Sequence, residues 1–275
     1  MREVTEAVLA LLQTGGRGAL ATVVASSGSV PQRAGARLLL RDDGSSVGTI
    51  GGGAIEQQVL GELREVLAHG QARMLRRDLT RDLGMCCGGH MEIFLEPVHA
   101  PPRLSLFGAG HVAVPTAQLA LSVGFDVHVV DEREELLTSE RFPGCRLHPV
   151  DAASYCKRHA FHAEHDWVLI VTHDHQLDED ILGLAVARPH AYIGLVGSRR
   201  KVLRLVDRVQ ARQGPAAQAL SFERVYAPVG LDLGALTPQE IAVSIVAEWV
   251  ALRRGKQGRH LSVLRNAGGA TGSAA

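Results

Sequence analysis

The first hundred residues mix two kinds of hydrophobic pattern. Apolar side chains recur at helical spacing in two segments, and three short apolar runs are bounded by turn-forming residues. The pattern predicts helices over residues 4–12 and 54–68, and strands over 19–25, 37–41 and 92–96. Together these elements indicate a small α+β domain. Pro97 and the pair Pro101–Pro102 then predict a linker.

The second half alternates apolar strands with amphipathic helices. The predicted strands cover residues 104–107, 127–130, 168–171 and 192–196, and the predicted helices cover 111–122, 178–187, 199–212 and 241–252. This alternation is typical of a parallel sheet wound with right-handed crossovers. The fold class is therefore α/β, a Rossmann-like domain (101–255) preceded by a smaller α+β domain (1–100). The Gly/Ala/Ser-rich tail, 256–275, is expected to be disordered.

A glycine-rich turn follows the first strand of the second half. Residues 107–113 read Phe-Gly-Ala-Gly-His-Val-Ala, between a predicted strand and a predicted helix. Gly108 would allow a sharp turn, and Gly110 would let backbone approach a phosphate at the helix N-terminus. Asp131 lies 21 residues after Gly110, where a ribose-binding acid would be. The pattern predicts a phosphate or nucleotide-like site, and a tight turn that binds nothing is the alternative.

A second glycine-rich segment, residues 48–56, reads Gly-Thr-Ile-Gly-Gly-Gly-Ala-Ile-Glu. The backbone amides of Gly52 and Gly53 at a helix start would form another anion-binding concavity, to which Arg33 could add a guanidinium fork. The segment lacks the Gly-Lys-Ser/Thr of a P-loop. A crowded strand-to-helix turn, with Arg33 in solvent, is an equal alternative.

Composition narrows the classes of function. The chain has 29 basic and 29 acidic residues, and this balance gives no electrostatic case for nucleic acid or an anionic membrane. No apolar run reaches the roughly 18 residues that a membrane span requires. The first residues lack an apolar signal core, and the four cysteines form no disulfide framework. We therefore expect a cytoplasmic protein.

Cys86 and Cys87 form the sharpest chemical feature, within the sequence Gly-Met-Cys-Cys-Gly-Gly at residues 84–89. A thiol among glycines can be exposed, and reactivity requires exposure. Adjacent cysteines are a poor zinc chelate, because structural zinc sites space them by two to four residues. A reactive sulfur carrier, a soft-metal ligand and inert buried thiols are the alternatives.

Two loops that follow later strands carry further candidates. The first could bind a metal or a phosphate through His173, His175 and Asp178. A loop that merely caps the next helix is the alternative there. Ser198 and Arg199 follow the strand at 192–196, where a helix N-terminus suits an anion. Both loops would lie at the carboxyl edge of the sheet, where doubly wound folds bind ligands.

Seven motifs in order resemble the XdhC/CoxI family, the xanthine dehydrogenase accessory proteins. The resemblance covers nearly everything from Ala19 to Leu252, and its motifs lie at residues 27–37, 48–56, 85–89, 107–112, 172–178, 192–201 and 237–245. Several long motifs in order are far more specific than any one glycine loop.

This resemblance implies an accessory protein rather than an enzyme. Such a protein binds molybdenum cofactor (molybdopterin), protects it during sulfuration and delivers it to xanthine dehydrogenase or a related molybdenum hydroxylase. The implied partners are a cysteine desulfurase and the subunits of the apo-dehydrogenase. The family motif has one cysteine before two glycines, which matches Cys87 and leaves Cys86 as the extra thiol. On this hypothesis one of these thiols contacts the metal or sulfur, and the cofactor contacts are Gly52, Gly53, Gly108, Gly110, Asp131, Ser198 and Arg199.

Two other functions fit the same glycine turn. An NAD(P)-dependent oxidoreductase would use the turn together with Asp131, although no Tyr-x-x-x-Lys pair accompanies them. A nucleotide-binding redox sensor would bind the same ligand without turnover. The sequence is compatible with a homodimer and does not identify the client enzyme.

Overall fold

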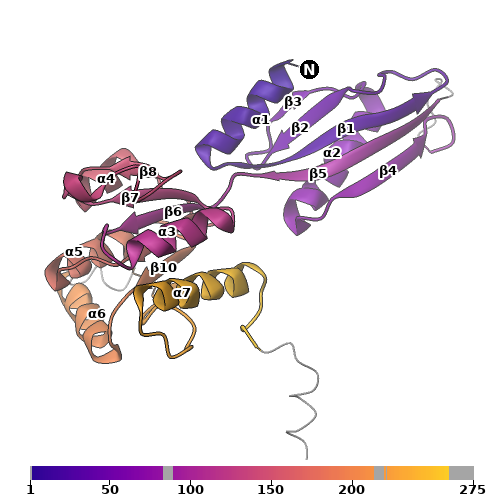
Figure 1. The fold of residues 1–275 in the computed structure, drawn as a ribbon. Helices are drawn as coiled ribbons and strands as arrows, with labels where there is room; N and C mark the ends of the chain where they lie inside the picture. Colours follow the sequence, from indigo (N-terminus) through magenta and orange to yellow (C-terminus); the bar gives the residue numbers. More distant parts are fainter. Residues whose placement is uncertain (1, 83–88, 214–219, 221, 260–275) are drawn as a thin grey trace, which may run out of the picture. The chain divides into compact units, whose positions relative to one another are not determined.

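The computed structural model describes residues 2–82, 89–213, 220 and 222–259. The chain divides into two compact units, Met1–Pro101 and Pro102–Ala275 (Figure 1). No helix within the described residues has both the length and the apolar content that a bilayer span requires.

The first unit is an antiparallel sheet with one helix on each face. Its strands lie in the order β3-β2-β1-β5-β4. Alternate residues of β1 and β2 face opposite helices, so that Leu39 packs on α1 while Leu38 and Leu40 pack on α2. The predicted α+β arrangement is therefore confirmed. The elements are α1 (Arg2–Thr14), β1 (Arg17–Ser27), β2 (Arg37–Arg41), β3 (Ser46–Gly48), α2 (Gly53–His69), β4 (Arg73–Asp78) and β5 (His90–His99).

Pro97 lies inside β5, so the linker predicted at this residue is wrong. It pairs opposite Ala19 of β1, whereas β4 begins with Arg73 opposite Leu95. The edge of β5 away from β1 is therefore open at Pro97. A proline can occupy a strand at such an edge, because its missing N–H has no ladder partner there.

The second unit is a six-stranded parallel sheet in the order β11-β10-β9-β6-β7-β8. The chain runs outward from β6 through β7 and β8, returns to β9 on the other side of β6, and continues to β11. This is the order of a doubly wound fold, with its switch point between β6 and β9. The Rossmann-like prediction is confirmed. The elements are β6 (Arg103–Phe107), α3 (Ala113–Ser122), β7 (Asp126–Val130), η1 (Glu134–Leu136), β8 (Arg146–His148), α4 (Ala152–Arg158), β9 (Asp166–Ile170), α5 (His175–Val186), β10 (Tyr192–Leu195), α6 (Arg199–Gln213), β11 (Val225–Tyr226) and α7 (Pro238–Arg253).

Helices cover both faces of the parallel sheet. On one face α3 and α7 lie side by side, and on the other face α4, α5 and α6 pack on a separate apolar cluster (Figure 1). α7 begins three residues before the predicted 241–252, because the Thr237 hydroxyl accepts from the Glu240 amide at 3.3 Å and Pro238 is its first residue. Such a capping box satisfies amides that the helix start would otherwise leave unpaired.

Trp249 anchors α7 to the sheet. Its side chain is fully buried, and its ring centre lies 5.2 Å from that of Phe125 and 6.3 Å from that of Trp167. The next residue, Val250, is 41% exposed. Trp249 therefore packs in the core, whereas its neighbour on α7, Val250, is partly in solvent.

We expect Trp249→Ala to lower the free energy of unfolding of the second unit by about 3–5 kcal/mol, because it leaves a large cavity. Val250→Ala should change it by no more than about 0.5 kcal/mol. Urea titration followed by tryptophan fluorescence measures both, since the chain has two tryptophans and Trp167 reports on this unit in either variant. Equal losses in the two variants would contradict this account of how α7 is held.

Candidate functional site

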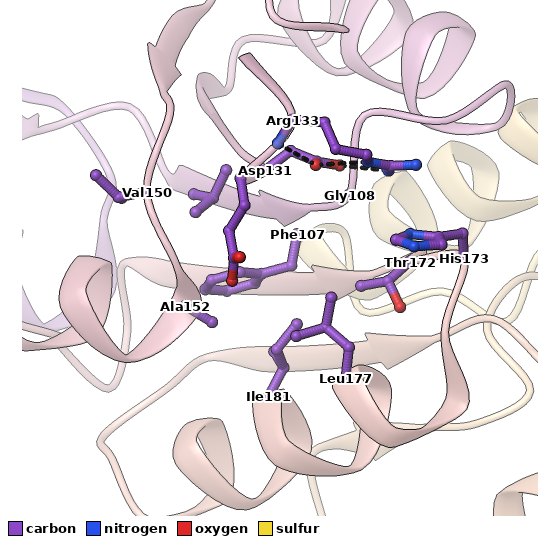
Figure 2. A pocket seen from close by; sticks show the side chains of 12 residues that line it. Phe107, Gly108, Asp131, Arg133, Val150, Ala152, Thr172, His173, Leu177 and Ile181 are labelled. Carbon is purple, nitrogen blue, oxygen red and sulfur yellow. Dashed lines mark hydrogen bonds and ion pairs between the residues drawn. The ribbon is translucent and has the colours of Figure 1, made fainter. Parts of the chain in front are cut away.

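A pocket of about 270 Å³ opens at the switch point of the parallel sheet (Figure 2). Its walls come from the ends of β6 and β7 and the residues that follow them, from the residues that follow β8 and β9, and from the first turns of α4 and α5. The pocket thus brings together the glycine turn and the acid that the sequence pattern predicts as a site. Its lining residues include Gly108, Asp131, Arg133, His173, Leu177 and Ile181.

The carboxylate of Asp131 accepts four hydrogen bonds from the chain itself. The Ala109 amide donates to Oδ2 at 2.8 Å, and the Arg133 amide donates to Oδ1 at 3.0 Å. The Arg133 guanidinium adds two more, from Nε at 2.9 Å and from Nη2 at 2.7 Å. Because a carboxylate has about four acceptor positions, Asp131 has little capacity left for a ribose hydroxyl.

Burial and hydrogen bonding act in opposite directions on Asp131, whose side chain is 7% exposed. Burial alone would raise the pKa of Asp131, but the hydrogen bonds from Arg133 and Ala109 outweigh it and lower the pKa. Asp131 in turn raises the pKa of Arg133. The pair is therefore charged at neutral pH and closes the glycine turn onto the end of β7.

Arg133 is the residue of this pocket that sequence reasoning missed. Its side chain is one-third exposed, and its guanidinium uses two of its five N–H groups on Asp131. Three donors are left for a ligand. The signal was present in the sequence, as an arginine two residues after the acid that ends β7. A planar guanidinium at a pocket wall suits a phosphate or carboxylate.

The two glycines of the turn have different roles. A Cβ on Gly108 would lie 2.7 Å from the carbonyl oxygen of Val171, and the φ angle of Gly108 is +107°. Gly108 is therefore required by the fold, where the turn passes close to the end of β9. A Cβ on Gly110 would meet no atom within 4 Å. The space beside Gly110 is open, as the predicted approach of a ligand requires.

The concavity at Gly52 and Gly53 is filled by a carboxylate of the chain. Glu56 Oε2 accepts from the amides of Ile50 and Gly52, both at 3.2 Å, and from the Thr49 hydroxyl. Burial would raise the pKa of Glu56, but these hydrogen bonds lower it. An external anion at Gly52 would compete with this internal one. The cofactor contact expected there stays a prediction.

The two histidines of the loop after β9 face different pockets. Asp174 caps α5 by accepting from the amides of Gln176 and Leu177 at 2.6 and 3.0 Å. His173 lines the switch-point pocket, and His175 lines a second pocket of about 380 Å³. Asp174 therefore caps α5, and the metal or phosphate contact predicted for His173 and His175 stays a prediction.

Asp178, the third candidate of that loop, is buried and bonded within the unit. Its carboxylate accepts from Lys201 Nζ at 2.7 Å and from the Thr172 hydroxyl at 2.6 Å. It ties α5 to α6 and is engaged inside the protein. Of the predicted anion contacts at the start of α6, Ser198 lines the second pocket and Arg199 is exposed beside it.

Cys86 and Cys87 lie outside the described residues, so their predicted role stays a prediction. The other two thiols have the character of inert cysteines. Burial raises the pKa of Cys145 to about 11 and raises that of Cys156 as well. A thiol that is protonated at neutral pH is a weak nucleophile and a poor metal ligand.

Three histidines on the α4 side of the sheet were not anticipated. His128, His148 and His159 come together from β7, the end of β8 and the end of α4. Burial, followed by the charges of the other two histidines, lowers the pKa of His148 to about 4. No spacing rule could reveal this cluster, because the sequence pattern predicted neither β8 nor α4.

Family models match both halves of the chain. The XdhC Rossmann domain matches residues 104–249, and the XdhC and CoxI family matches residues 11–78. The chain belongs to the XdhC and CoxI family. This confirms the resemblance seen in the sequence motifs. Each matched segment contains one of the two glycine-rich turns, residues 107–113 in the first and residues 48–56 in the second.

Three curated proteins are similar to this chain in sequence. The chain is 37% identical to YqeB of Escherichia coli over 87% of its own length and 44% of the relative. It is 36% identical to a Bacillus subtilis protein named as a probable subunit of xanthine dehydrogenase, over 59% of its length and 46% of the relative. It is 23% identical to the molybdenum cofactor insertion chaperone PaoD of Escherichia coli, over 86% and 84% of the two chains. The chain spans less than half the length of the first two.

A solved structure has the same fold as this XdhC-family chain. It is that of a xanthine dehydrogenase from Bacillus halodurans, with a TM-score of 0.52, 23% identity, and coverage of 95% of this chain and 98% of the other. At this identity the likeness concerns the fold alone.

We expect Glu56→Gln to destabilise the first unit by about 1–2 kcal/mol at pH 7, because hydrogen bonds to a charged acceptor are stronger than those to an amide. The loss should shrink with acidification. A lowered folded-state pKa gives stability that is complete above the unfolded pKa of about 4.3 and disappears as pH falls through the folded value. Calorimetric unfolding of both proteins at pH 6 and pH 3 measures the difference. Glu65→Gln, an exposed substitution on the same helix, is the control, and a gap unchanged at pH 3 would contradict the role of Glu56.

Proposed function

We propose that this chain is an accessory protein that binds molybdenum cofactor, holds it during sulfuration and delivers it to xanthine dehydrogenase or a related molybdenum hydroxylase. A cysteine desulfurase and the apo-dehydrogenase are the proposed partners, and the chain itself would catalyse no reaction. Family membership and the relationship to PaoD support this proposal.

The observation that carries the proposal is the pocket at the switch point of the sheet. Arg133 lines this pocket with three unused N–H groups, which fit an anionic ligand that carries a phosphate. Gly110 does not line the pocket, but it lies two residues after Gly108, which does, and the space beside it is open. The cofactor would supply the molybdenum and sulfur chemistry. Arg133 and the turn at Gly110 would hold its phosphate, while Leu177 and Ile181 offer an apolar surface to its ring system.

The bonding of Asp131 weighs against a dinucleotide as the resident ligand. A ribose-binding acid needs free acceptor positions, whereas Asp131 already accepts from Ala109 and Arg133. A ribose would have to displace a charge-assisted, bidentate contact. The nicotinamide oxidoreductase and the nucleotide sensor are therefore less well supported than a phosphate-bearing pterin.

The first test measures loading. The full chain is expressed in cells that synthesise the cofactor and purified without oxygen, and molybdenum and oxidised pterin are then quantified per chain. We expect both in the wild type and a loss of at least tenfold in Gly110→Ala, where a methyl group would occupy the open space. Gly61→Ala is the matched control, because Gly61 lies on helix α2 with equally open surroundings.

Two outcomes of this test would overturn the proposal. One is the absence of both molybdenum and pterin, with a nicotinamide nucleotide purified in their place. The other is equal loading of Gly110→Ala and the wild type, which would remove the turn at Gly110 from the binding site. Gly110→Ala should fold normally, since its Cβ meets no atom and its φ lies outside the left-handed region.

The second test measures delivery and the predicted role of the thiols. Loaded chain, cysteine desulfurase and cysteine are mixed with an apo-xanthine dehydrogenase, and recovered dehydrogenase activity is followed. Because thiolates bind soft metal centres, we expect Cys87→Ser to lower the recovered activity at least tenfold and Cys86→Ser to leave it near the wild-type value. Equal activity in wild type and both variants would refute a role for either thiol.

A further inference from the structure

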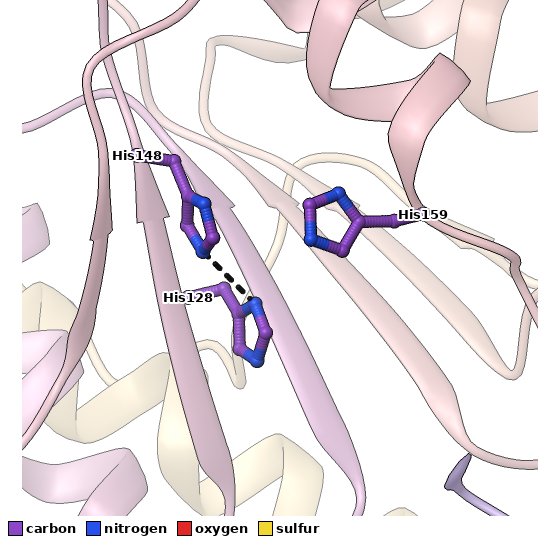
Figure 3. Close-up of side chains that lie close together, drawn as sticks. All are labelled: His128, His148 and His159. Carbon is purple, nitrogen blue, oxygen red and sulfur yellow. Dashed lines mark hydrogen bonds between the residues drawn. The ribbon is translucent and has the colours of Figure 1, made fainter.

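The three histidines noted above form a compact group on one face of the parallel sheet (Figure 3). One nitrogen from each of His128, His148 and His159 lies within 4.8 Å of the other two, and His148 Nε2 is 3.1 Å from His128 Nδ1. Within the described residues, no other group of three or more His, Cys or carboxylate side chains comes this close together. His128 is 5% exposed, while the other two are partly open to solvent.

The spacing of these nitrogens is close to that of a metal site. A tetrahedral zinc with Zn–N distances of 2.0–2.1 Å separates its ligand nitrogens by about 3.3 Å. The His128–His148 separation of 3.1 Å is near this value. His159 follows the last turn of α4, and its ring stacks on that of Tyr155 with the ring centres 4.1 Å apart, so the third nitrogen comes from a ring that is held in place within 4.8 Å of the other two.

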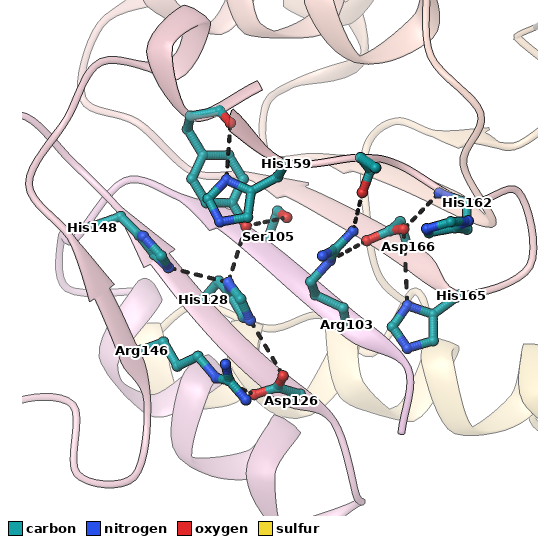
Figure 4. Close-up of polar contacts among 12 residues, drawn as sticks. Arg103, Ser105, Asp126, His128, Arg146, His148, His159, His162, His165 and Asp166 are labelled. Atoms are coloured by element: carbon teal, nitrogen blue, oxygen red, sulfur yellow. Dashed lines mark hydrogen bonds and ion pairs between the residues drawn. The ribbon is translucent and has the colours of Figure 1, made fainter. Parts of the chain in front are cut away.

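In His128 and His159, the ring nitrogen that would not bind the ion already has a hydrogen-bond partner (Figure 4). His128 Nε2 lies 3.3 Å from Asp126 Oδ2, and His159 Nδ1 lies 3.0 Å from the backbone carbonyl oxygen of Tyr155. Asp126 is itself held by Arg146 Nε at 3.2 Å. Carboxylate and carbonyl partners of this kind fix the tautomer of metal-binding histidines and direct the other nitrogen, as a lone pair, toward the ion.

We propose that His128, His148 and His159 bind one divalent transition-metal ion of the zinc class through three imidazole nitrogens. The fourth position would face the hydroxyl of Tyr155, which lies 3.2 Å from His128 Nδ1 and 3.0 Å from Ser105 Oγ. Three imidazoles with one further position suit zinc, cobalt and nickel. An ion here would tie the short strand β8 and the end of α4 to β7.

If the three histidines bind no metal, the expected effect of a histidine variant on metal binding is different. In that case, His148 Nε2–H would donate to the lone pair of His128 Nδ1, and the rings would be satisfied without an ion. Loss of one ring would then leave metal binding by the chain unchanged. The site is independent of the proposed cofactor function, because none of its three ligands lines the switch-point pocket.

The experiment uses the full chain with Cys86→Ser and Cys87→Ser, so that these thiols cannot bind the probe ions. Zn²⁺ binding is measured by equilibrium dialysis with metal analysis, and Co²⁺ binding by visible absorption. We expect one ion per chain and a tetrahedral cobalt spectrum without a thiolate charge-transfer band. His148→Gln in this background should abolish both signals. His69→Gln, which changes an exposed histidine at the end of α2, should leave them unchanged.

A second variant, Asp126→Asn, keeps all three histidines and therefore tests the site even if His148→Gln does not fold. Asp126→Asn should weaken Zn²⁺ binding about 10–100-fold while keeping one ion per chain, as loss of a ligand's hydrogen-bond partner does elsewhere. Zn²⁺ should also raise the thermal midpoint of the wild-type second unit and leave that of His148→Gln unchanged. Absence of a bound ion in the double-serine chain, or equal affinity in His148→Gln and His69→Gln, would overturn the proposal.

Discussion

The carboxylate of Asp131 is the contact on which the switch-point pocket depends. It joins the amide of Ala109, after β6, to the backbone and side chain of Arg133, after β7. Two loops that are separate in sequence therefore share one buried charge, and removing it would leave a partly buried guanidinium and an amide without their acceptor. The same contact leaves Asp131 little further acceptor capacity, whereas three N–H groups of Arg133 remain unused by Asp131.

The long elements of the fold could be predicted from the sequence, and the short ones could not. Apolar runs of strand length and helices of ten or more residues produce a periodic signal, which is why β6, β7, β9 and α3 follow the pattern closely. β3, β8 and β11 have two or three residues each, too few for any period. β4 carries the charged residues Arg73, Arg76, Arg77 and Asp78 and buries little besides Leu75, so its pairing with β5, rather than its composition, makes it a strand.

The candidate site was predictable as a set of backbone turns and much less so as a set of side chains. A glycine in a strand-to-helix turn indicates that something approaches closely, but it does not say what. At Gly108 the neighbour is the chain's own Val171, whereas at Gly110 the space is open. Likewise the acids Glu56 and Asp131 stand where anion sites and ribose contacts are expected, yet both accept hydrogen bonds from the chain itself. Such pairings depend on tertiary geometry, which one sequence does not display.

The two glycine-rich turns share one physical arrangement. In each, a backbone amide of the turn donates to a carboxylate supplied by the chain: the amides of Ile50 and Gly52 donate to Glu56 in the first unit, and the amide of Ala109 donates to Asp131 in the second. An internal anion stabilises an amide-rich turn in the absence of any ligand. It also lowers the gain available to an incoming phosphate, which must bind through other donors or displace the acid. A turn built in this way has its amides paired when no ligand is present, and an incoming anion would have to compete with the internal one. Both properties agree with the transfer of a ligand to another protein that we propose for this chain.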